Sequence, residues 1–211
     1  MNWPGIDQWE ALMQAAGAAG TEAKWYDLLT KAYAEPQRYY HNRQHIAECL
    51  EEFNQVRHLA KQPAAVELAL WFHDAVYDPK AGDNEERSAE LAAKCLQESR
   101  VAPALIAIVV QLVMVTKKHE TGDDLDAKIM VDVDLSILGR DEKRFFEYEE
   151  QIRREYAWVS PEVFGPKRAE ILERFLAREN IFSTDRFRQK YGEQARKNLT
   201  ASIQKLKHMP Q

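Results

Sequence analysis

Apolar residues recur at intervals of three and four along most of the chain, and almost no segment alternates apolar with polar positions. Intervals of three and four residues place side chains on one face of a helix, whereas alternation would indicate a half-buried strand. We therefore expect an all-α fold, a bundle of about nine or ten helices. The helices are predicted over about 25–32, 45–53, 63–73, 83–96, 101–115, 129–138, 141–158, 166–177 and 184–207.

Residues that favour helix ends stand where several of these segments begin or end. Pro63 is expected in the first turn of its helix, and Asp83 and Thr184 are expected to cap theirs. Gly139 follows the apolar stretch 129–138 in the position of a helix C-terminus. The longest apolar stretch, 101–115, is expected to be a buried central helix, because a membrane span needs roughly 18–20 residues.

The 211 residues carry 29 basic and 34 acidic side chains, a net charge of −5, with 45% hydrophobic residues. This composition fits one all-α domain over residues 1–211, with a core over about 36–140 and charged helices over about 141–208. The acidic balance argues against binding bulk nucleic acid. Only Cys49 and Cys95 are cysteines, and the N-terminus lacks a basic, apolar leader. We therefore expect a cytoplasmic protein with no disulfide framework and no membrane partner.

Three short strings concentrate the chemistry. His41 and His45 are four residues apart, which makes them neighbours on one face if both lie on a helix. The pair His73-Asp74 ends a long apolar helix, where such side chains are costly to bury unless they are paired or bind a metal. The acids Asp132 and Asp134 lie within an otherwise apolar segment.

Imidazole and carboxylate groups together suit divalent ions such as Mn, Fe, Co, Ni and Zn, and the absence of a thiolate from these strings argues against a structural zinc site. Such an ion would lower the pKa of a bound water and polarise a phosphoryl oxygen. A second histidine one turn away would then protonate the leaving oxygen. The spacing predicts a hydrolytic site but does not choose its substrate.

The order of His45, His73-Asp74 and Asp134 resembles the H…HD…D pattern of the HD superfamily of metal-dependent phosphohydrolases. The string Tyr40-His41-Asn42-x-x-His45 looks like the motif of cyclic-nucleotide phosphodiesterases, which share that helical core. The resemblance implies that His41 is the general acid and that the metal ligands are His45, His73, Asp74 and Asp134. Asp134 matches better than Asp132 because the family's distal aspartate is typically followed by leucine.

A longer run, from Glu35-Pro36-x-Arg38 through Trp71-Phe72-His73-Asp74 to Asp134-Leu135-Ser136-Ile137-Leu138-Gly139, resembles a bacterial branch described only as predicted HD phosphohydrolases. This resemblance extends over most of the chain and implies a single HD-type domain. We expect one divalent ion, with Mn, Fe, Co, Ni, Zn and Mg as candidates, because a single histidine lies between the HD doublet and the distal aspartate.

The chain departs from the related patterns in two places. Phosphodiesterases have a further histidine where this chain has Tyr77-Asp78-Pro79, so cyclic-nucleotide specificity does not follow. Binuclear members have two histidines between the HD doublet and the distal aspartate, whereas this chain has only His119 there. His119 is therefore a candidate for contacting the phosphate, or for completing a weaker second site with Asp78.

Further polar residues are candidates for supporting the ligands or holding a phosphate: Asp132, Arg38 and Lys117. Each has a simpler interpretation. Asp132 is a candidate helix cap, and charged residues usually form a solvated face. His73-Asp74 would also be stable as a self-paired core histidine, His41 as a backbone hydrogen-bond partner and His119 as a loop residue.

We therefore expect a divalent-metal-dependent phosphohydrolase, either a phosphomonoesterase or a phosphodiesterase, with Asp74 and His41 in the catalytic machinery. Its substrate would be a nucleotide or another small phosphate ester, attacked by a metal-activated water. The alternatives are a di-iron oxygenase of the same fold and a non-catalytic nucleotide-sensing protein. The charged C-terminal helices have apolar stripes that would either cap the core or pair with another subunit in a homo-oligomer.

Overall fold

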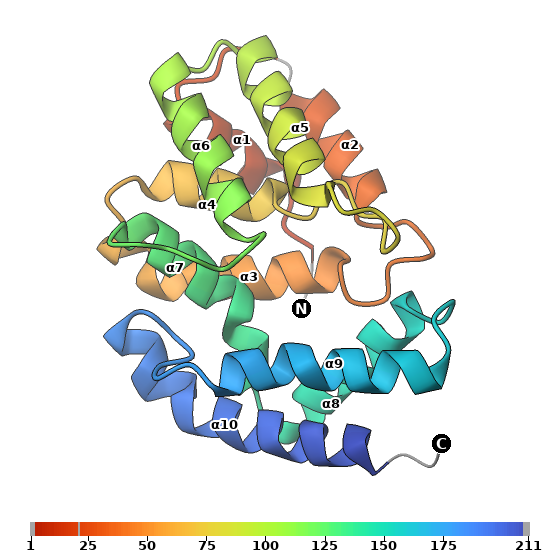
Figure 1. The fold of residues 1–211 in the computed structure, drawn as a ribbon. Helices are drawn as coiled ribbons and strands as arrows, with labels where there is room; N and C mark the ends of the chain where they lie inside the picture. The colour runs from red at the N-terminus through yellow and green to blue at the C-terminus, as the bar shows by residue number, and fades with distance from the viewer. Residues whose placement is uncertain (1–2, 21, 209–211) are drawn as a thin grey trace. The chain divides into compact units, whose positions relative to one another are not determined.

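The computed structural model in Figure 1 describes residues 3–20 and 22–208. All regular secondary structure in these residues is helical, which confirms the expected all-α bundle of about ten helices. The α-helices are α1 (Ile6–Ala15), α2 (Glu22–Ala32), α3 (Arg43–Val56), α4 (Pro63–Phe72), α5 (Asn84–Glu98), α6 (Pro103–Val115), α7 (Leu125–Asp134), α8 (Glu142–Glu155), α9 (Pro161–Leu176) and α10 (Asp185–Lys207). Two 3-10 helices are η1 (Arg57–Leu59) and η2 (Leu135–Gly139).

The chain divides into two compact units between Asp134 and Leu135. The N-terminal unit contains α1 to α7, and the C-terminal unit contains η2 and α8 to α10. The division lies close to the predicted start of the charged C-terminal helices, although no Gly/Ser/Pro-rich linker marks it. That the whole chain acts as one domain stays a prediction.

Helix α4 is the centre of the N-terminal unit. It packs against α1, α3, α5, α6 and α7, and every one of its residues except Glu67 is apolar, because a helix surrounded by others has little surface facing water. Its buried residues are Ala65, Val66, Leu68, Ala69, Leu70, Trp71 and Phe72. This arrangement matters for the site, since α4 leads directly into His73 and Asp74.

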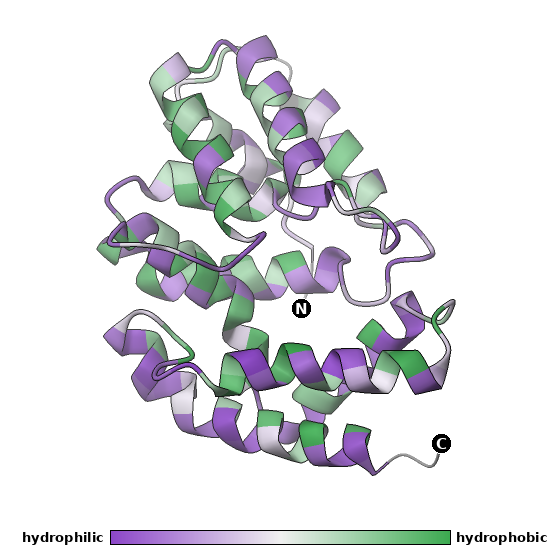
Figure 2. Cartoon of the chain, viewed as in Figure 1, coloured by the Kyte–Doolittle hydropathy of each residue, from purple (hydrophilic) through white to green (hydrophobic). Residues whose placement is uncertain are grey.

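The expectation that residues 101–115 form the central helix is wrong. Figure 2 colours both α4 and α6 as hydrophobic, but α6 packs mainly on α4 and α5 and buries one face, which includes Ile106, Val109, Leu112 and Val113. Its remaining apolar residues are partly exposed, because hydropathy alone does not say how many neighbours surround a helix. No helix in the described residues combines the length and apolarity needed to cross a membrane.

Several helix ends differ from the sequence-based expectation. Pro63 does open α4, but Asp83 and Thr184 stand at N-cap positions without forming a side-chain cap hydrogen bond. The predicted helix 129–138 is α7 followed by η2, and α9 begins at Pro161, five residues before the predicted Pro166, which lies inside it. The pattern-based list omitted α1, whose buried side chains are Trp9, Leu12 and Met13.

Gly139 has a packing role in the C-terminal unit. A Cβ atom at this position would lie 2.5 Å from the Cβ of Tyr191 and 2.7 Å from its carbonyl oxygen, so only glycine lets η2 approach α10 this closely. Asn198 of α10 reinforces the contact, because its Nδ2 donates to the carbonyl oxygens of Leu138 and Arg140, each at 2.9 Å. Gly139 therefore sets the distance between two helices.

A buried polar cluster also holds the C-terminal unit together. The Arg168 guanidinium on α9 donates to the Tyr148 hydroxyl at 2.6 Å and forms an ion pair with Glu149, both on α8. Ser202 of α10 donates to the other carboxylate oxygen of Glu149 at 2.8 Å. Three helices thus share one cluster that contains both a cation and an anion.

Candidate metal centre

The start of helix α3 places His45 in its first turn. The side chain of Asn42 accepts a hydrogen bond from the backbone N–H of Gln44 at 2.8 Å, which caps the helix, so α3 begins at Arg43. His41 therefore precedes the helix, and the expectation of two histidines on one helix face is wrong. Their rings are nevertheless 6.1 Å apart, because the chain turns tightly into the cap.

The end of helix α4 delivers His73 and Asp74. His73 is the C-cap residue of α4, and its Nδ1 lies 3.0 Å from the carbonyl oxygen of Leu70. A carbonyl only accepts hydrogen bonds, so Nδ1 must carry the proton. In the neutral ring, Nε2 then has its lone pair free to face the cluster, as a metal-ligating histidine requires.

Helix α7 ends at Asp134, and a second aspartate fixes the helix beside α4. The two carboxylate oxygens of Asp126 accept hydrogen bonds from the backbone N–H groups of Lys61 and Gln62, at 2.7 and 2.8 Å. These groups lie at the N-terminus of α4, where N–H donors lack partners within the helix. The start of α7 is thus attached to the start of α4, and the ends of both helices meet at the site.

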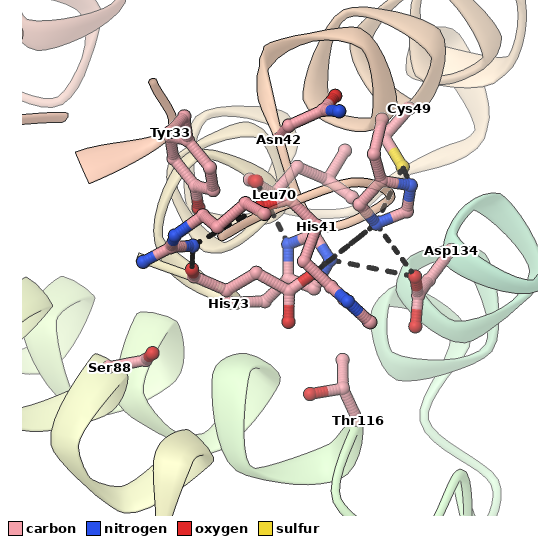
Figure 3. Close-up of polar contacts among 12 residues, drawn as sticks. Tyr33, His41, Asn42, Cys49, Leu70, His73, Ser88, Thr116 and Asp134 are labelled. Carbon is pink, nitrogen blue, oxygen red and sulfur yellow. Dashed lines mark hydrogen bonds and ion pairs between the residues drawn. The ribbon is translucent and has the colours of Figure 1, made fainter. Parts of the chain in front are cut away.

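Four donor atoms converge where α3, α4 and α7 meet (Figure 3). The Nε2 atoms of His45 and His73 are 3.1 Å apart. Asp74 Oδ2 lies 3.3 and 3.1 Å from these two atoms, and Asp134 Oδ1 lies 3.3 and 3.5 Å from them. Nitrogen and oxygen ligands bonded to one ion at ~2.0–2.2 Å are themselves about 3–3.5 Å apart. The donor atoms of His45, His73 and Asp74 lie within 4.8 Å of one another, so these three residues could hold a divalent cation, with Asp134 beside both histidines.

The cluster is closed on the histidine side and partly open on the carboxylate side. The side chains of His45 and His73 are each 2% exposed, whereas those of Asp74 and Asp134 are 19% and 16% exposed. A bound ion would therefore be reached from solvent past the carboxylates. Such an opening is typical of a catalytic metal site, whereas a structural site is closed by protein ligands.

The electrostatics of the metal-free cluster reflect two acids that share a buried site with two bases. Burial alone lowers the pKa of His45 and of His73. Cys49 and Tyr40, followed by Asp134 and Asp74, raise the pKa of His45 well above its ordinary value, and Asp74 and Asp134 do the same for His73. Burial alone raises the pKa of Asp74 and Asp134, and the neighbouring histidines lower both well below the ordinary one. The cluster thus attracts positive charge, supplied either by protons or by a metal ion.

The proposed acid His41 is held by stacking. Its ring lies on that of Tyr77 with centroids 4.1 Å apart and an interplanar angle of 25°. The stack makes Tyr77 a neighbour of the site. His41 itself is part-buried and lies close enough to Asp74 to lower the pKa of that carboxyl group.

Arg38 holds the backbone around His41 and Asp74. The buried guanidinium donates to the carbonyl oxygens of His41 at 3.3 Å and of Ala75 at 3.0 Å, and also to that of Asp74. Its Nε donates to Glu35 at 2.9 Å. Its described hydrogen bonds therefore fix the turn that carries Asp74, and this geometry fits a supporting role better than the role of a phosphate ligand.

His119 reaches the edge of the cluster. Its Nε2 lies 3.4 Å from Asp134 Oδ2, on the oxygen that does not face His45 and His73. The backbone of His119 has φ +53°, a left-handed conformation that non-glycine residues rarely adopt and that tends to occur at functional sites. His119, which stands between the HD doublet and the distal aspartate in the sequence, therefore lies beside a predicted ligand in the fold.

The remaining predicted residues make other contacts. Asp78 Oδ1 accepts from the backbone N–H of Lys80 at 2.9 Å, and the Asp78 carbonyl accepts from Asn84, so Asp78 organises its own loop. Lys117 donates to the carbonyl of Gly82 at 3.0 Å and pairs with Glu86. Asp132 is fully buried on α7, two residues before Asp134. Among these contacts none joins the four-donor cluster.

Cys49 is the residue that sequence reasoning missed. Its sulfur lies 3.7 Å from Nδ1 and 3.8 Å from Nε2 of His45, and Cys49, His45 and Asp134 form a second group of donors within 4.8 Å of one another. The premise that a thiol is absent from the site is wrong. The signal was available, because Cys49 follows His45 by four residues on a predicted helix.

Comparison of the chain with protein-family models, with curated proteins and with solved structures returns no match.

Proposed function

We propose that this protein is a divalent-metal-dependent phosphohydrolase that acts on a nucleotide or another small phosphate ester. The observation that carries the proposal is the convergence of His45, His73, Asp74 and Asp134, with five donor separations between 3.1 and 3.5 Å. The choice of phosphate esters rests on the resemblance of these residues, in this order, to the HD superfamily.

When bound, a divalent ion at this site lowers the pKa of a water molecule and polarises a phosphoryl oxygen. His45, His73, Asp74 and Asp134 would hold it, and the hydrogen bond from His73 Nδ1 to Leu70 keeps the Nε2 lone pair directed at the cluster. The partial exposure of the two carboxylates leaves an approach for water and substrate.

Proton transfer to the leaving oxygen is assigned to His41. The stack on Tyr77 restricts the orientation of its ring, and Arg38 binds the backbone carbonyls of both His41 and Asp74, which fixes the acid relative to the ligand. A general acid has to be positioned before its pKa matters, and these contacts supply that positioning. His119, next to Asp134, is placed to orient that carboxylate.

The first experiment is elemental analysis of protein purified without a chelator or a histidine tag, beside an Asp74→Ala variant. We expect about one transition-metal ion per chain in the wild type and none in Asp74→Ala, with unchanged helical content by circular dichroism. An Asp78→Ala variant is the matched control, because its carboxylate lies near the site in sequence but contacts its own loop.

The second step is a screen of phosphate monoesters, phosphodiesters and nucleotides with the metal-loaded protein. Turnover that requires the metal and is lost in Asp74→Ala would support the proposal. Retained turnover in Asp74→Ala, or a wild-type protein that binds no divalent ion even when Mn²⁺ is added, would contradict it. Two irons per chain would instead favour an oxygenase.

A further inference from the structure

A cavity lies among the three α-helices of the C-terminal unit. It has a volume of about 190 Å³ and is lined by residues of α8, α9 and α10. Phe146, Phe164 and Leu206 contribute apolar side chains to its walls, whereas Gly165 contributes none. A Cβ atom at Gly165 would have one neighbour within 4 Å, the carbonyl oxygen of Leu206 at 3.6 Å, so the space in front of this part of α9 is open.

The size and the walls of the cavity suit an aromatic ring. An apolar cavity of about 150 Å³ in a protein core binds benzene, and this one is slightly larger. Its lining is predominantly apolar, and Phe146 on α8 and Phe164 on α9 offer ring faces and edges against which another ring packs. Sites for small molecules combine such walls with a few polar groups that fix the orientation of the ligand.

The two buried polar side chains of the lining act as hydrogen-bond acceptors. Ser202 is 3% exposed, and its O–H already donates to the Glu149 carboxylate at 2.8 Å. The Glu149 carboxylate, which also pairs with Arg168, has only lone pairs to offer. A molecule in the cavity would therefore be held here by an N–H or O–H group of its own, whereas a carbonyl or carboxylate would face other acceptors.

The charges around the cavity favour a neutral ligand. The charged side chains of the lining are two acids and two bases, so their formal charges cancel: Glu149, Glu150, Arg153 and Lys205. The Arg153 guanidinium lies 4.7 Å from the centroid of the Phe164 ring. The Lys205 ammonium lies 5.4 Å from the centroid of the Phe146 ring. Both rings therefore already attract a cation of the protein, which disfavours a second cation brought by a ligand.

We propose that this cavity is a binding site for a neutral aromatic molecule of one or two rings that carries a hydrogen-bond donor. Phenol and indole are the simplest members of this class. The ring packs against Phe146 and Phe164, and its donor group is directed at Glu149 or Ser202. The site is formed by the C-terminal unit alone, whereas the ligands of the proposed metal centre belong to the N-terminal unit, so the two proposals stand independently.

Helix α9 supplies a matched pair of phenylalanines for the test. Phe164 lines the cavity and Phe175 does not, although both are partly buried. Each ring also has an arginine guanidinium 4.7 Å from its centroid, that of Arg153 for Phe164 and that of Arg178 for Phe175. Phe164→Ala and Phe175→Ala therefore remove the same ring and the same kind of contact, but only Phe164→Ala removes a wall of the cavity.

The test is isothermal titration calorimetry of the full chain with indole and with phenol. We expect the wild type and Phe175→Ala to bind one molecule per chain, and Phe164→Ala to bind at least ~10-fold more weakly, because it lacks one aromatic wall. Fluorobenzene, which has the size of phenol but no donor, should bind roughly 3- to 10-fold more weakly than phenol. Benzoate and benzylammonium, which carry charges, should bind more weakly than either neutral donor.

A second variant, Leu206→Phe, fills the cavity instead of removing a wall and should also weaken binding. It decides the matter if circular dichroism shows that Phe164→Ala does not fold. Absence of binding by the wild type, or equal binding by the wild type and the folded variants at Phe164 and Leu206, would overturn the proposal. So would fluorobenzene binding as tightly as phenol, or a charged probe binding more tightly than phenol. Metal content measured on the same samples tests the metal centre separately, and none of these results alters it.

Discussion

Each unit contains a buried cluster of charged side chains, and the two clusters differ in whether an arginine or lysine side chain supplies the positive charge. In the C-terminal unit, the Arg168 guanidinium meets Glu149, and Tyr148 and Ser202 complete the cluster. Burial alone lowers the pKa of Arg168, but Tyr148 and Glu149 raise it above the ordinary value, so the guanidinium stays charged. Protein side chains therefore supply both the cation and the anion of this cluster.

In the N-terminal unit, two carboxylates face two histidines, and their positive charge has to come from protons or from a bound ion. The Arg38 guanidinium, beside the turn that carries Asp74, donates to backbone carbonyls. A buried anion is stable only when it is compensated, so this cluster needs either protons or a bound cation. The comparison favours a structural role for the Arg168 cluster and supports the proposal that the N-terminal cluster binds an ion.

The largest effect should come from Asp134→Asn, which removes one carboxylate from the N-terminal cluster with little change in shape. The loss of a charged ligand should weaken metal binding at least ~100-fold, so that protein purified without added metal contains none and turnover falls below detection. Elemental analysis and activity assays with and without added metal measure this. Wild-type metal content in the variant would show that Asp134 is not a ligand.

The second effect should appear in stability and not in metal binding. Glu149→Ala leaves the buried Arg168 guanidinium without its anion, and breaking a buried ion pair in this way costs about 3–5 kcal/mol in the free energy of unfolding. Urea denaturation of the chelator-treated protein measures it, and the metal content should stay at about one ion per chain. A loss below ~1 kcal/mol would contradict the structural role of this pair.

Much of the fold could be predicted because helical periodicity is a local property of the sequence. The segments around His45, His73 and the C-terminal helix were placed correctly, and Pro63 opens its helix as expected. What failed depended on neighbours distant in sequence. The central position was predicted for residues 101–115, which form α6, whereas α4 occupies it, since both helices are apolar and only the packing of other helices distinguishes them.

For the site, too, the residues of the short strings could be predicted, whereas contacts that depend on the folding of distant segments could not. The ordered histidines and aspartates indicated a cluster, and the structure brings four of the predicted residues together. Cys49 lies outside the strings of histidine and aspartate on which the predicted site was based. For Arg38 the choice between supporting a ligand and holding a phosphate stayed open, because a sequence does not say which backbone carbonyls a guanidinium will meet. The left-handed backbone of His119 likewise has no signature in its neighbouring residues.

The stability of the metal-free protein should also depend on pH, through the histidines and aspartates of the N-terminal cluster and not through the Arg168 cluster. His45 and His73 have raised pKa values, so their contribution to stability is complete below about pH 6.5 and is lost as pH rises through the native values. Asp74 and Asp134 have lowered pKa values. Their contribution to stability is therefore complete above about pH 4 and is lost as pH falls through their pKa values in the folded protein.

The metal-free protein should therefore be most stable between about pH 4 and pH 6.5, and should lose stability above this window by up to about 1.4 kcal/mol per pH unit for each proton involved. Metal binding requires unprotonated Nε2 atoms, so the stabilisation by saturating Zn²⁺ should increase over the same rise in pH. Urea denaturation at pH 5.5 and pH 8.5, with chelator and with Zn²⁺, tests both statements. Metal-free stability that rises across this range would contradict the assigned protonation.

The smallest effect should come from Asp126, the carboxylate that shares helix α7 with Asp134 but already has its own partners. Two backbone N–H groups at the start of α4 donate to it, so it needs no added cation. Asp126→Ala leaves these donors without an acceptor and should cost about 1–3 kcal/mol in the free energy of unfolding. Its metal content should remain at about one ion per chain, with affinity reduced less than ~10-fold, below the range for residues that support a ligand directly.

Urea denaturation and metal titration of Asp126→Ala, beside Asp134→Asn, would compare two aspartates on one helix. If metal binding were lost in both variants, the alignment of α7 beside α4 would be as important to the site as the ligand itself. If metal binding is lost only in Asp134→Asn, then the donor groups around a carboxylate decide whether it binds a metal or has a structural role. We expect the second result, because the hydrogen bonds from α4 complete the Asp126 carboxylate, whereas the histidines that meet Asp134 also face another acid.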